Sequence, residues 1–179
     1  ASNRARSNAA RQANGSMLLN LSHASFRSDD EAARLAALRT YQLTPDDSDN
    51  GLYADLVALA RTIGSCETAF ISIVEEERQW FKASEGLDID QTPRSIAFCD
   101  HAIRSSEVMV VLDAAQDPRF ADNPLVTGPP HIRFYAGAPV INSDGFALGT
   151  ICLSDSQPRD RFDGAPLLAA LARQSGRQV

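Results

Sequence analysis

The chain has 179 residues, of which 44% are hydrophobic and 22% are charged, and its 17 basic and 23 acidic residues give a formal net charge of −6. This length and composition predict one globular domain with its own core, and they exclude collagen-like and low-complexity chains. No apolar run approaches the ~20 residues of a membrane helix, and the acidic charge disfavours nucleic acids and anionic membrane surfaces as partners.

The N-terminal segment differs in charge from the rest of the chain. Residues 1–27 contain four arginines and no acidic residue, and their Ser, Asn, Ala and Arg content shows no hydrophobic periodicity. We expect residues 1–27 to be a disordered or appended tail, without the apolar stretch of a signal peptide. The main domain is expected to span residues 28–162 together with its N-terminal helices, and residues 163–179 to begin a C-terminal signalling helix.

Two helices are expected at the start of the domain. Ser28 and Glu31 have the spacing of a reciprocal helix cap and predict a helix over 28–40. A second helix is predicted over 50–63, with Gly64 closing it in the left-handed conformation. The apolar stripe of this second helix consists of Leu52, Leu56, Leu59 and Ile63.

A hairpin and a loop follow. The β-branched run 69–74 predicts a buried strand, and the charged turn 75–77 connects it to a second strand over 78–84. So short a connection makes the two strands antiparallel. Residues 86–93 are expected to form a loop.

A helix predicted over 95–105 carries the cysteine and the histidine that lie closest together in the sequence. Cys99 and His101 point about 200° apart on a helix, so they do not form a catalytic pair, and Cys99 belongs to the apolar side. The three cysteines and three histidines show no metal-ligand spacing, so we expect no metal site. Three widely spaced cysteines predict reduced thiols and a cytoplasmic protein.

A long segment without predicted regular structure interrupts the last part of the chain. A short strand over 108–112 precedes 113–133, in which prolines and glycines separate short apolar pieces. Segments of this length are uncommon in compact domains and often form binding loops or lids. Two strands, 134–141 and 146–154, then form a hairpin around an Asp-Gly turn, and a last helix begins near Asp163.

The expected order is two helices, a hairpin, a helix, a strand, the long segment, a second hairpin and a last helix. The short connections leave no room for crossover helices, so a mainly antiparallel sheet and an α+β fold are predicted. A small-molecule cavity is expected between this sheet, the helix 95–105 and the segment 113–133.

Several aromatic side chains could line such a cavity or could simply fill the core. These side chains come from different segments of the chain. If they fill the core, Phe134 is one of the residues that occupy the space of the cavity. Polar groups at strand ends would converge on a ligand, although Arg133 and Asp155 could equally form a structural ion pair. The candidate pocket residues are Trp80, Phe98, Cys99, His101, Asp113, Phe120, Arg133, Tyr135 and Asp155.

Several motifs in this order resemble bacterial GAF domains of signal-transduction proteins. They are the ERQWFK motif at 77–82, AFCDHAI at 97–103, the run 117–128 and IRFYAGAP at 132–139. The resemblance implies a central antiparallel sheet of five to six strands with helices on its faces. The first, second and last helices would pack together in one layer and mediate a homodimer. It also implies a sensory or regulatory module, not an enzyme, linked to an output domain such as a sensor kinase, a diguanylate cyclase or phosphodiesterase, or a regulator.

The ligand of such a module is unknown from the sequence. Bilin-binding relatives place the attachment cysteine directly before a histidine, whereas Asp100 separates Cys99 from His101 here, which disfavours a bilin. The lysine-containing motif of cyclic-nucleotide-binding relatives is absent. Three hypotheses therefore stay open: a ligand- or redox-gated sensor, a ligand-free dimerisation module, and an enzyme similar to the free methionine-sulfoxide reductases that would use Cys99 or Cys152.

Overall fold

The computed structural model describes residues 27, 29–45 and 51–177, so nearly all of the predicted tail lies outside the described residues. No helix in this part of the chain is both long and apolar enough to cross a membrane. The helices are α2 (Glu31–Thr40), α3 (Leu52–Gly64), α4 (Phe98–Ala102), α5 (Pro124–Thr127) and α6 (Ala165–Gly176), with a 3-10 helix η1 (Arg94–Ile96). The strands are β1 (Thr68–Val74), β2 (Arg78–Glu85), β3 (Gln91–Pro93), β4 (Met109–Val111), β5 (Phe134–Ile141) and β6 (Ala147–Asp155).

The strands form one sheet in the order β3-β2-β1-β6-β5-β4, and every neighbouring pair is antiparallel. This arrangement confirms the predicted α+β fold with a central antiparallel sheet. The sequence pattern does not predict β3, which lies within the expected loop 86–93 and pairs with the outer edge of β2. Three residues are too few to show a strand periodicity.

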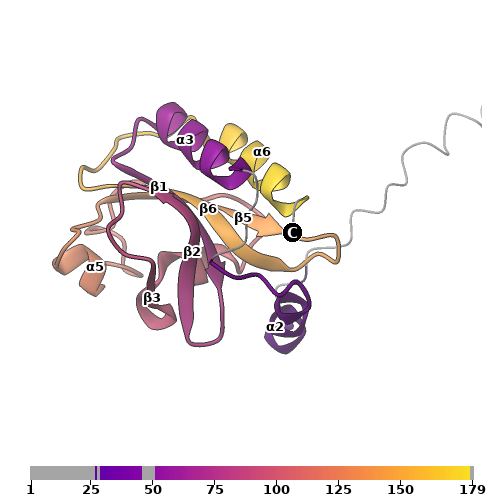
Figure 1. Cartoon of the computed structure of the whole chain (residues 1–179). Coiled ribbons are helices and arrows are strands. Elements are labelled where there is room, and N and C mark those ends of the chain that lie inside the picture. The colour runs from indigo at the N-terminus through magenta and orange to yellow at the C-terminus, as the bar shows by residue number, and fades with distance from the viewer. Residues whose placement is uncertain (1–26, 28, 46–50, 178–179) are drawn as a thin grey trace, which may run out of the picture.

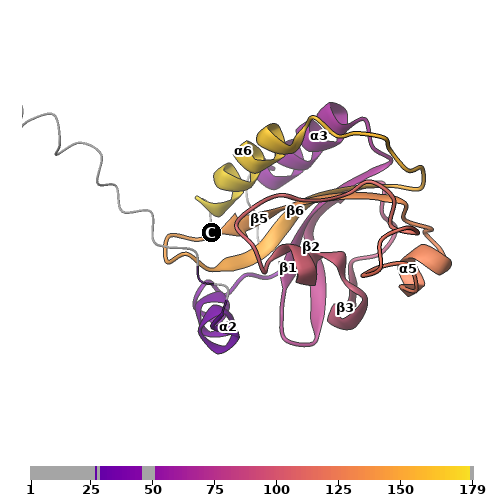
Figure 2. The same ribbon diagram turned by 180° about the vertical axis from the view of Figure 1, so that it is seen from behind.

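Each face of the sheet has its own cover. Helices α3 and α6 lie side by side over one face and bury an apolar cluster that includes Val57, Ile151 and Leu168 (Figure 1). The second and last helices therefore pack together, as predicted. The other face is covered by α4 and the segment 113–133, which contains α5 (Figure 2).

Helix α2 lies apart from α3 and α6 (Figure 2), which corrects the expectation that the first helix shares their layer. It packs instead where the β1–β2 and β5–β6 turns meet, and Leu38 joins Ile73, Trp80 and Leu148 in a small apolar cluster. A buried arginine fixes the helix there, because Arg34 Nη1 donates a hydrogen bond to the carbonyl oxygen of Ala147 at 3.3 Å. The apolar side of a helix shows that it packs, but not against which surface.

Two predicted helix ends lie at neighbouring residues instead. The N-cap of α2 is Asp30, whose side chain accepts a hydrogen bond from the backbone N–H of Ala33 at 2.8 Å, and the predicted cap Ser28 lies outside the described residues. Gly64 is the last residue of α3, and the left-handed cap predicted for it is instead Ser65, with φ 48°. Gly64 is needed for packing, because a Cβ there would lie 2.5 Å from Cδ1 of Leu153.

Two predicted helices also differ in detail from the structure. Leu59 and Ile63 of α3 are 52% and 42% exposed, whereas Tyr53 and Val57 are buried, so the buried stripe is rotated relative to the predicted one. The expected helix 95–105 consists of η1 and α4, because Ala97 between them has an extended backbone with φ −76° and ψ 124°. Cys99 nevertheless lies on the buried side of α4, as expected.

Strands β1 and β6 approach so closely at Gly149 that a Cβ there would lie 1.8 Å from the carbonyl oxygen of Ser72. We expect Gly149→Ala to lower the free energy of unfolding by about 3 kcal/mol, because the new methyl group would have to push apart two paired strands at the centre of the sheet. Urea denaturation followed by circular dichroism measures this. The matched control is Gly128→Ala, whose Cβ would lie 3.1 Å from the Pro124 oxygen, and it should cost less than about 1 kcal/mol. Equal losses in the two variants would contradict the close approach.

Candidate functional site

The segment 113–133 is a series of hydrogen-bonded turns, not an unstructured loop. Asn123 fixes it at two points: its side-chain oxygen accepts from the N–H of Leu125 at 2.9 Å, and its Nδ2 donates to the carbonyl of Ile96 at 3.0 Å. The first bond caps α5 and the second attaches the segment to η1. The segment is thereby held over the sheet as a structured cover.

An ion pair closes the two ends of this cover. Nε and Nη2 of Arg133 donate to the two carboxylate oxygens of Asp113, each at 2.7 Å. These hydrogen bonds hold the pKa of the Asp113 carboxyl below its usual value. The alternative ion pair of Arg133 with Asp155 is not formed; the Asp155 carboxylate faces Arg159 at 3.4 Å, and only its backbone carbonyl accepts from the N–H of Arg133.

The predicted aromatic residues on this face are packed against one another. Phe98 and Phe120 stack at 4.1 Å, and Tyr135 lies 5.0 Å from Phe98. His101 meets Phe120 edge-on at 4.8 Å, and burial lowers the pKa of its imidazole. The centre of the face is therefore filled, and the cavity expected there lies to one side.

A buried polar cluster lies beneath these rings, and we call Ser72, Cys99, Tyr135, Thr150 and Cys152 the thiol cluster. The two sulfurs are 3.5 Å apart, and the Tyr135 hydroxyl donates to Cys99 Sγ at 3.4 Å while lying 3.1 Å from Cys152 Sγ. Thr150 Oγ1 lies 2.7 Å from Cys152 Sγ and 2.9 Å from Ser72 Oγ.

Hydrogen bonding in the thiol cluster separates the acidities of its two thiols. Burial raises the pKa of the Cys99 thiol, but hydrogen bonds from its neighbours, that from Cys152 foremost, outweigh burial and lower it below its usual value. Burial raises the pKa of Cys152 and of Tyr135.

The cavity on this face lies between the cover and β2, and we call it the loop cavity. It measures about 70 Å³, and its apolar wall includes Phe70, Phe81, Leu125 and Ile132. Of the predicted site residues, only Asp155 lines it. Trp80 points to the other side of β2, because neighbouring residues of a strand face opposite sides of the sheet.

Gln79, which the sequence analysis does not single out, contributes the amide of the loop cavity. The residue is 3% exposed, its Nε2 donates to Thr92 Oγ1 at 2.9 Å, and its Oε1 is buried without a hydrogen-bond partner. No other buried side-chain nitrogen or oxygen within the described residues lacks a partner. Rotation of the amide exchanges its two polar atoms, so one unpaired atom remains in either orientation. A Gln in a strand gives no sequence signal of this kind.

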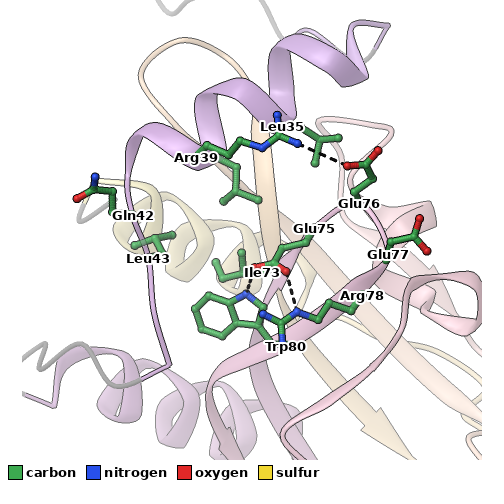
Figure 3. A pocket seen from close by; sticks show the side chains of 11 residues that line it. Leu35, Arg39, Gln42, Leu43, Ile73, Glu75, Glu76, Glu77, Arg78 and Trp80 are labelled. Carbon is green, nitrogen blue, oxygen red and sulfur yellow. Dashed lines mark hydrogen bonds and ion pairs between the residues drawn. The ribbon is translucent and has the colours of Figure 1, made fainter.

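A second cavity, the α2 groove, lies between α2 and the β1–β2 turn and measures about 450 Å³ (Figure 3). Trp80 lines it and donates from Nε1 to Glu75 at 2.8 Å, and Arg78 donates to the same carboxylate at 2.7 Å. Arg39 and Glu76 face each other across it at 3.5 Å. These polar side chains are hydrogen-bonded or ion-paired with one another. Unlike Gln79 in the loop cavity, they leave no buried polar atom that a ligand would have to pair.

Arg94 connects α2 to α4 next to the α2 groove. Its Nη1 donates to Glu31 at 2.5 Å and its Nε donates to Asp100 at 2.8 Å. Glu31 also accepts two hydrogen bonds from Arg34, at 2.7 and 2.9 Å. The hydrogen bond from Arg34 foremost, with that from Arg94, lowers the pKa of Glu31 to about 2. Within the described residues, no three His, Cys, Asp or Glu side chains are grouped so as to hold a metal ion.

Comparison with known proteins supports the resemblance seen in the sequence. The sequence profile of the GAF domain matches residues 19–179. The chain is 45% identical over 131 residues to a cyclic di-GMP phosphodiesterase of Pseudomonas aeruginosa, a match that covers 73% of this chain and 22% of that protein. The chain therefore spans less than a quarter of this curated relative.

Solved structures share the fold at lower identity. The GAF domain of an Acinetobacter phosphoenolpyruvate-protein phosphotransferase is 20% identical, with a TM-score of 0.58 over 85% of this chain and 93% of that one. The free methionine-R-sulfoxide reductase of Neisseria meningitidis, solved with its substrate, is 18% identical, with a TM-score of 0.58 over 87% of this chain and 95% of that one. At these identities the likeness shows the fold alone.

The low pKa of Glu31 predicts how the attachment of α2 depends on pH. Because the pKa is depressed in the folded state, the stabilisation is complete above the unfolded pKa of about 4.3 and is lost as the pH falls toward 2. Glu31→Gln should lower the free energy of unfolding by about 1 kcal/mol at pH 7, within the range for partly exposed pairs, and by much less at pH 2. Urea titrations at both pH values test this, with the exposed Glu107→Gln as control. A loss that is the same at both pH values would contradict the prediction.

Proposed function

Because this chain belongs to the GAF-domain family, we propose that it is a non-catalytic sensory domain that binds a small molecule in the loop cavity and relays its occupancy to an output domain of a longer protein. The P. aeruginosa relative is a cyclic di-GMP phosphodiesterase, and the match covers 22% of it. We therefore propose that the output controlled by this domain is the turnover of a cyclic dinucleotide in the cytoplasm. Ligand binding would act by favouring one of two packings of the domain.

The observation that carries the ligand site is the unpaired oxygen of Gln79. A buried polar atom without a partner destabilises a protein by about 1–3 kcal/mol, so such atoms are rare unless a water or a ligand satisfies them. Gln79 lies on the wall of the loop cavity, where a bound molecule would reach it. The site thus calls for a hydrogen-bond donor at this point.

The other residues of the loop cavity limit the chemical class of the ligand. Its walls are mostly apolar, and the carboxylates of Glu67 and Asp155 belong to its polar lining. Two carboxylates disfavour an anionic ligand, so we propose a small neutral or cationic molecule with an N–H or O–H group and an apolar part. A volume of about 70 Å³ holds roughly two waters at ~30 Å³ each, so a larger ligand requires the cover at 125–132 to move outward.

Replacement of Gln79 by methionine tests the site. A thermal-shift screen of amino acids, amines, nucleosides and their neutral analogues should identify compounds that raise Tm, and Gln79→Met should weaken their binding about tenfold or more, measured by calorimetry. The same variant removes the buried unpaired acceptor but also the hydrogen bond to Thr92, so without ligand its stability should stay within about 1 kcal/mol of the wild type. Gln91→Met is the matched control, since Gln91 is an exposed residue of β3 and should leave affinity unchanged.

Two outcomes would contradict the ligand site. One is a screen in which no compound raises Tm, which would favour a ligand-free dimerisation module. The other is equal affinity in the wild type and in Gln79→Met, which would place the ligand elsewhere. In either case the membership of the GAF family is unaffected.

The enzymatic alternative has less support in the geometry. A reductase acting on a methionine sulfoxide needs a thiolate in contact with its substrate. Cys99 and Cys152 are fully buried, and no cysteine lines the loop cavity or the α2 groove. We expect no turnover of free methionine sulfoxide by the purified domain.

We also propose that the domain forms a homodimer through α3 and α6. Leu59 and Ile63 of α3 and Leu167 of α6 are 52%, 42% and 44% exposed, and the two helices lie side by side (Figure 1). In a dimer with two-fold symmetry, the same surface of a second copy would cover these side chains. The α2 helix lies outside this surface.

Mutation of the exposed leucine and isoleucine tests the dimer. The double variant Leu59→Ser with Ile63→Ser should be monomeric in light scattering coupled to size exclusion, whereas the wild type should be dimeric. Leu112→Ser, which removes an exposed leucine at the end of β4, is the control and should remain dimeric. A monomeric wild type at micromolar concentration would overturn the proposal.

A further inference from the structure

The thiol cluster takes no part in the proposed ligand site. Its two cysteines come from different elements, Cys99 from α4 and Cys152 from the central strand β6. Both are fully buried, and their sulfurs are 3.5 Å apart, although no disulfide joins them. We propose that Cys99 and Cys152 form a redox-active pair that is converted to an intramolecular disulfide by hydrogen peroxide.

The surroundings hold the two sulfurs in place for this bond. The Tyr135 hydroxyl contacts both of them, and it fits there because residue 137 is glycine: a Cβ at Gly137 would lie 2.3 Å from that hydroxyl. Gly137 pairs with Cys152 across β5 and β6, so the space that a side chain at 137 would take beside Cys152 is occupied by the Tyr135 hydroxyl. Formation of a disulfide of about 2.05 Å requires the sulfurs to approach by only about 1.5 Å.

The helix that carries Cys99 is short. Helix α4 has five residues and is preceded by the extended Ala97, so a small shift of α4 toward the sheet is a local movement that carries the Phe98 ring and its stack on Phe120 with it. Cys152, in contrast, is fixed between β1 and β5. The disulfide would therefore form by movement of α4, with the sheet unchanged.

The reaction balances with hydrogen peroxide as the oxidant. The Cys99 thiolate attacks one peroxide oxygen, the O–O bond breaks, and the leaving oxygen takes up a proton to give one water and a sulfenic acid on Cys99. The sulfur of Cys152 then attacks the sulfur of Cys99, its proton passes to the departing hydroxide, and a second water leaves. The two thiols are oxidised by two electrons and the peroxide is reduced to two waters. In this order Cys99, on the short helix α4, reacts first, and Cys152, fixed in the central strand, completes the bond.

The burial of the pair selects a small oxidant. Phe70 pairs with Cys152 across β1 and β6 and also lines the loop cavity, so the cavity and this cysteine share Phe70 as a neighbour. Hydrogen peroxide, little larger than water, passes when this ring moves, whereas a bulky organic hydroperoxide or an alkylating reagent does not. The Tyr135 hydroxyl acts as a positioning group for the pair.

Mass spectrometry of the peroxide-treated chain tests the pair. The folded protein is exposed to hydrogen peroxide, unfolded, alkylated and digested without reductant. We expect a peptide linked through Cys99 and Cys152 in the wild type and in Cys66→Ser, lost on treatment with dithiothreitol, and absent from Cys99→Ser and Cys152→Ser. Tyr135→Phe keeps both thiols and should slow the linkage about fivefold, because it removes one hydrogen bond to Cys99.

The outcomes that overturn the proposal are equally specific. They are an untouched pair of thiols after exposure that oxidises free cysteine, a single oxidised cysteine without a linked peptide, or a linked peptide that contains Cys66. If a serine variant fails to fold, the linked peptide in the wild type and the rate in Tyr135→Phe still decide between these results. Circular dichroism of each variant before treatment identifies such a failure.

Discussion

The antiparallel pairing of β1 with β6 is the constraint on which the other features depend. It brings together strands from opposite halves of the chain at the centre of the sheet, and it is possible because Gly149 has no side chain to meet the carbonyl of Ser72. The register places Ser72 beside Thr150 and Phe70 beside Cys152. The thiol cluster and one wall of the loop cavity follow from this register.

The two faces of the sheet make different contributions. Under α3 and α6 the side chains are apolar, and burial of residues such as Val57 and Ile151 supplies stability without any polar requirement. The opposite face accepts polar groups, and the thiol cluster satisfies its own members by mutual hydrogen bonds. Gln79 is the exception on this face, since its oxygen is buried and unpaired. A free domain that tolerates such an atom retains a capacity to gain stability from a ligand.

Much of the fold could be predicted from the sequence, because the strands and turns have local signals. The β-branched run of β1 and the Asp-Gly turn between β5 and β6 identify the two hairpins. The segment 113–133 is predicted as a binding loop or lid without regular structure, whereas it forms turns and α5, which depend on caps such as Asn123 that the spacing of residues does not reveal. The place of α2 could not be predicted, because its apolar side fits more than one surface.

The candidate site could be predicted less well, for reasons that lie in β2. Gln79, Trp80 and Phe81 are consecutive and at least partly buried, so polarity does not show which side of the strand each one faces. Trp80 consequently belongs to the α2 groove and Gln79 to the loop cavity. The partner of Arg133 depends on the turn geometry that brings Asp113 near it, and the unpaired state of Gln79 depends on every neighbour at once. Neither property can be predicted from the spacing of residues in the sequence.

The attachment of α2 has a consequence for how the domain responds to its surroundings. Two of its contacts with the rest of the domain, Arg94 with Glu31 and Arg39 with Glu76, join opposite charges with at least one exposed partner. Dissolved ions weaken such contacts most when the screening length, about 3 Å at 1 M, approaches the distance between the charges, whereas the apolar contacts beneath α3 and α6 are insensitive to screening. We therefore expect high ionic strength to weaken the attachment of α2 before it affects the packing of α3 and α6, so the salt content of the cell is itself a variable to which this helix is exposed.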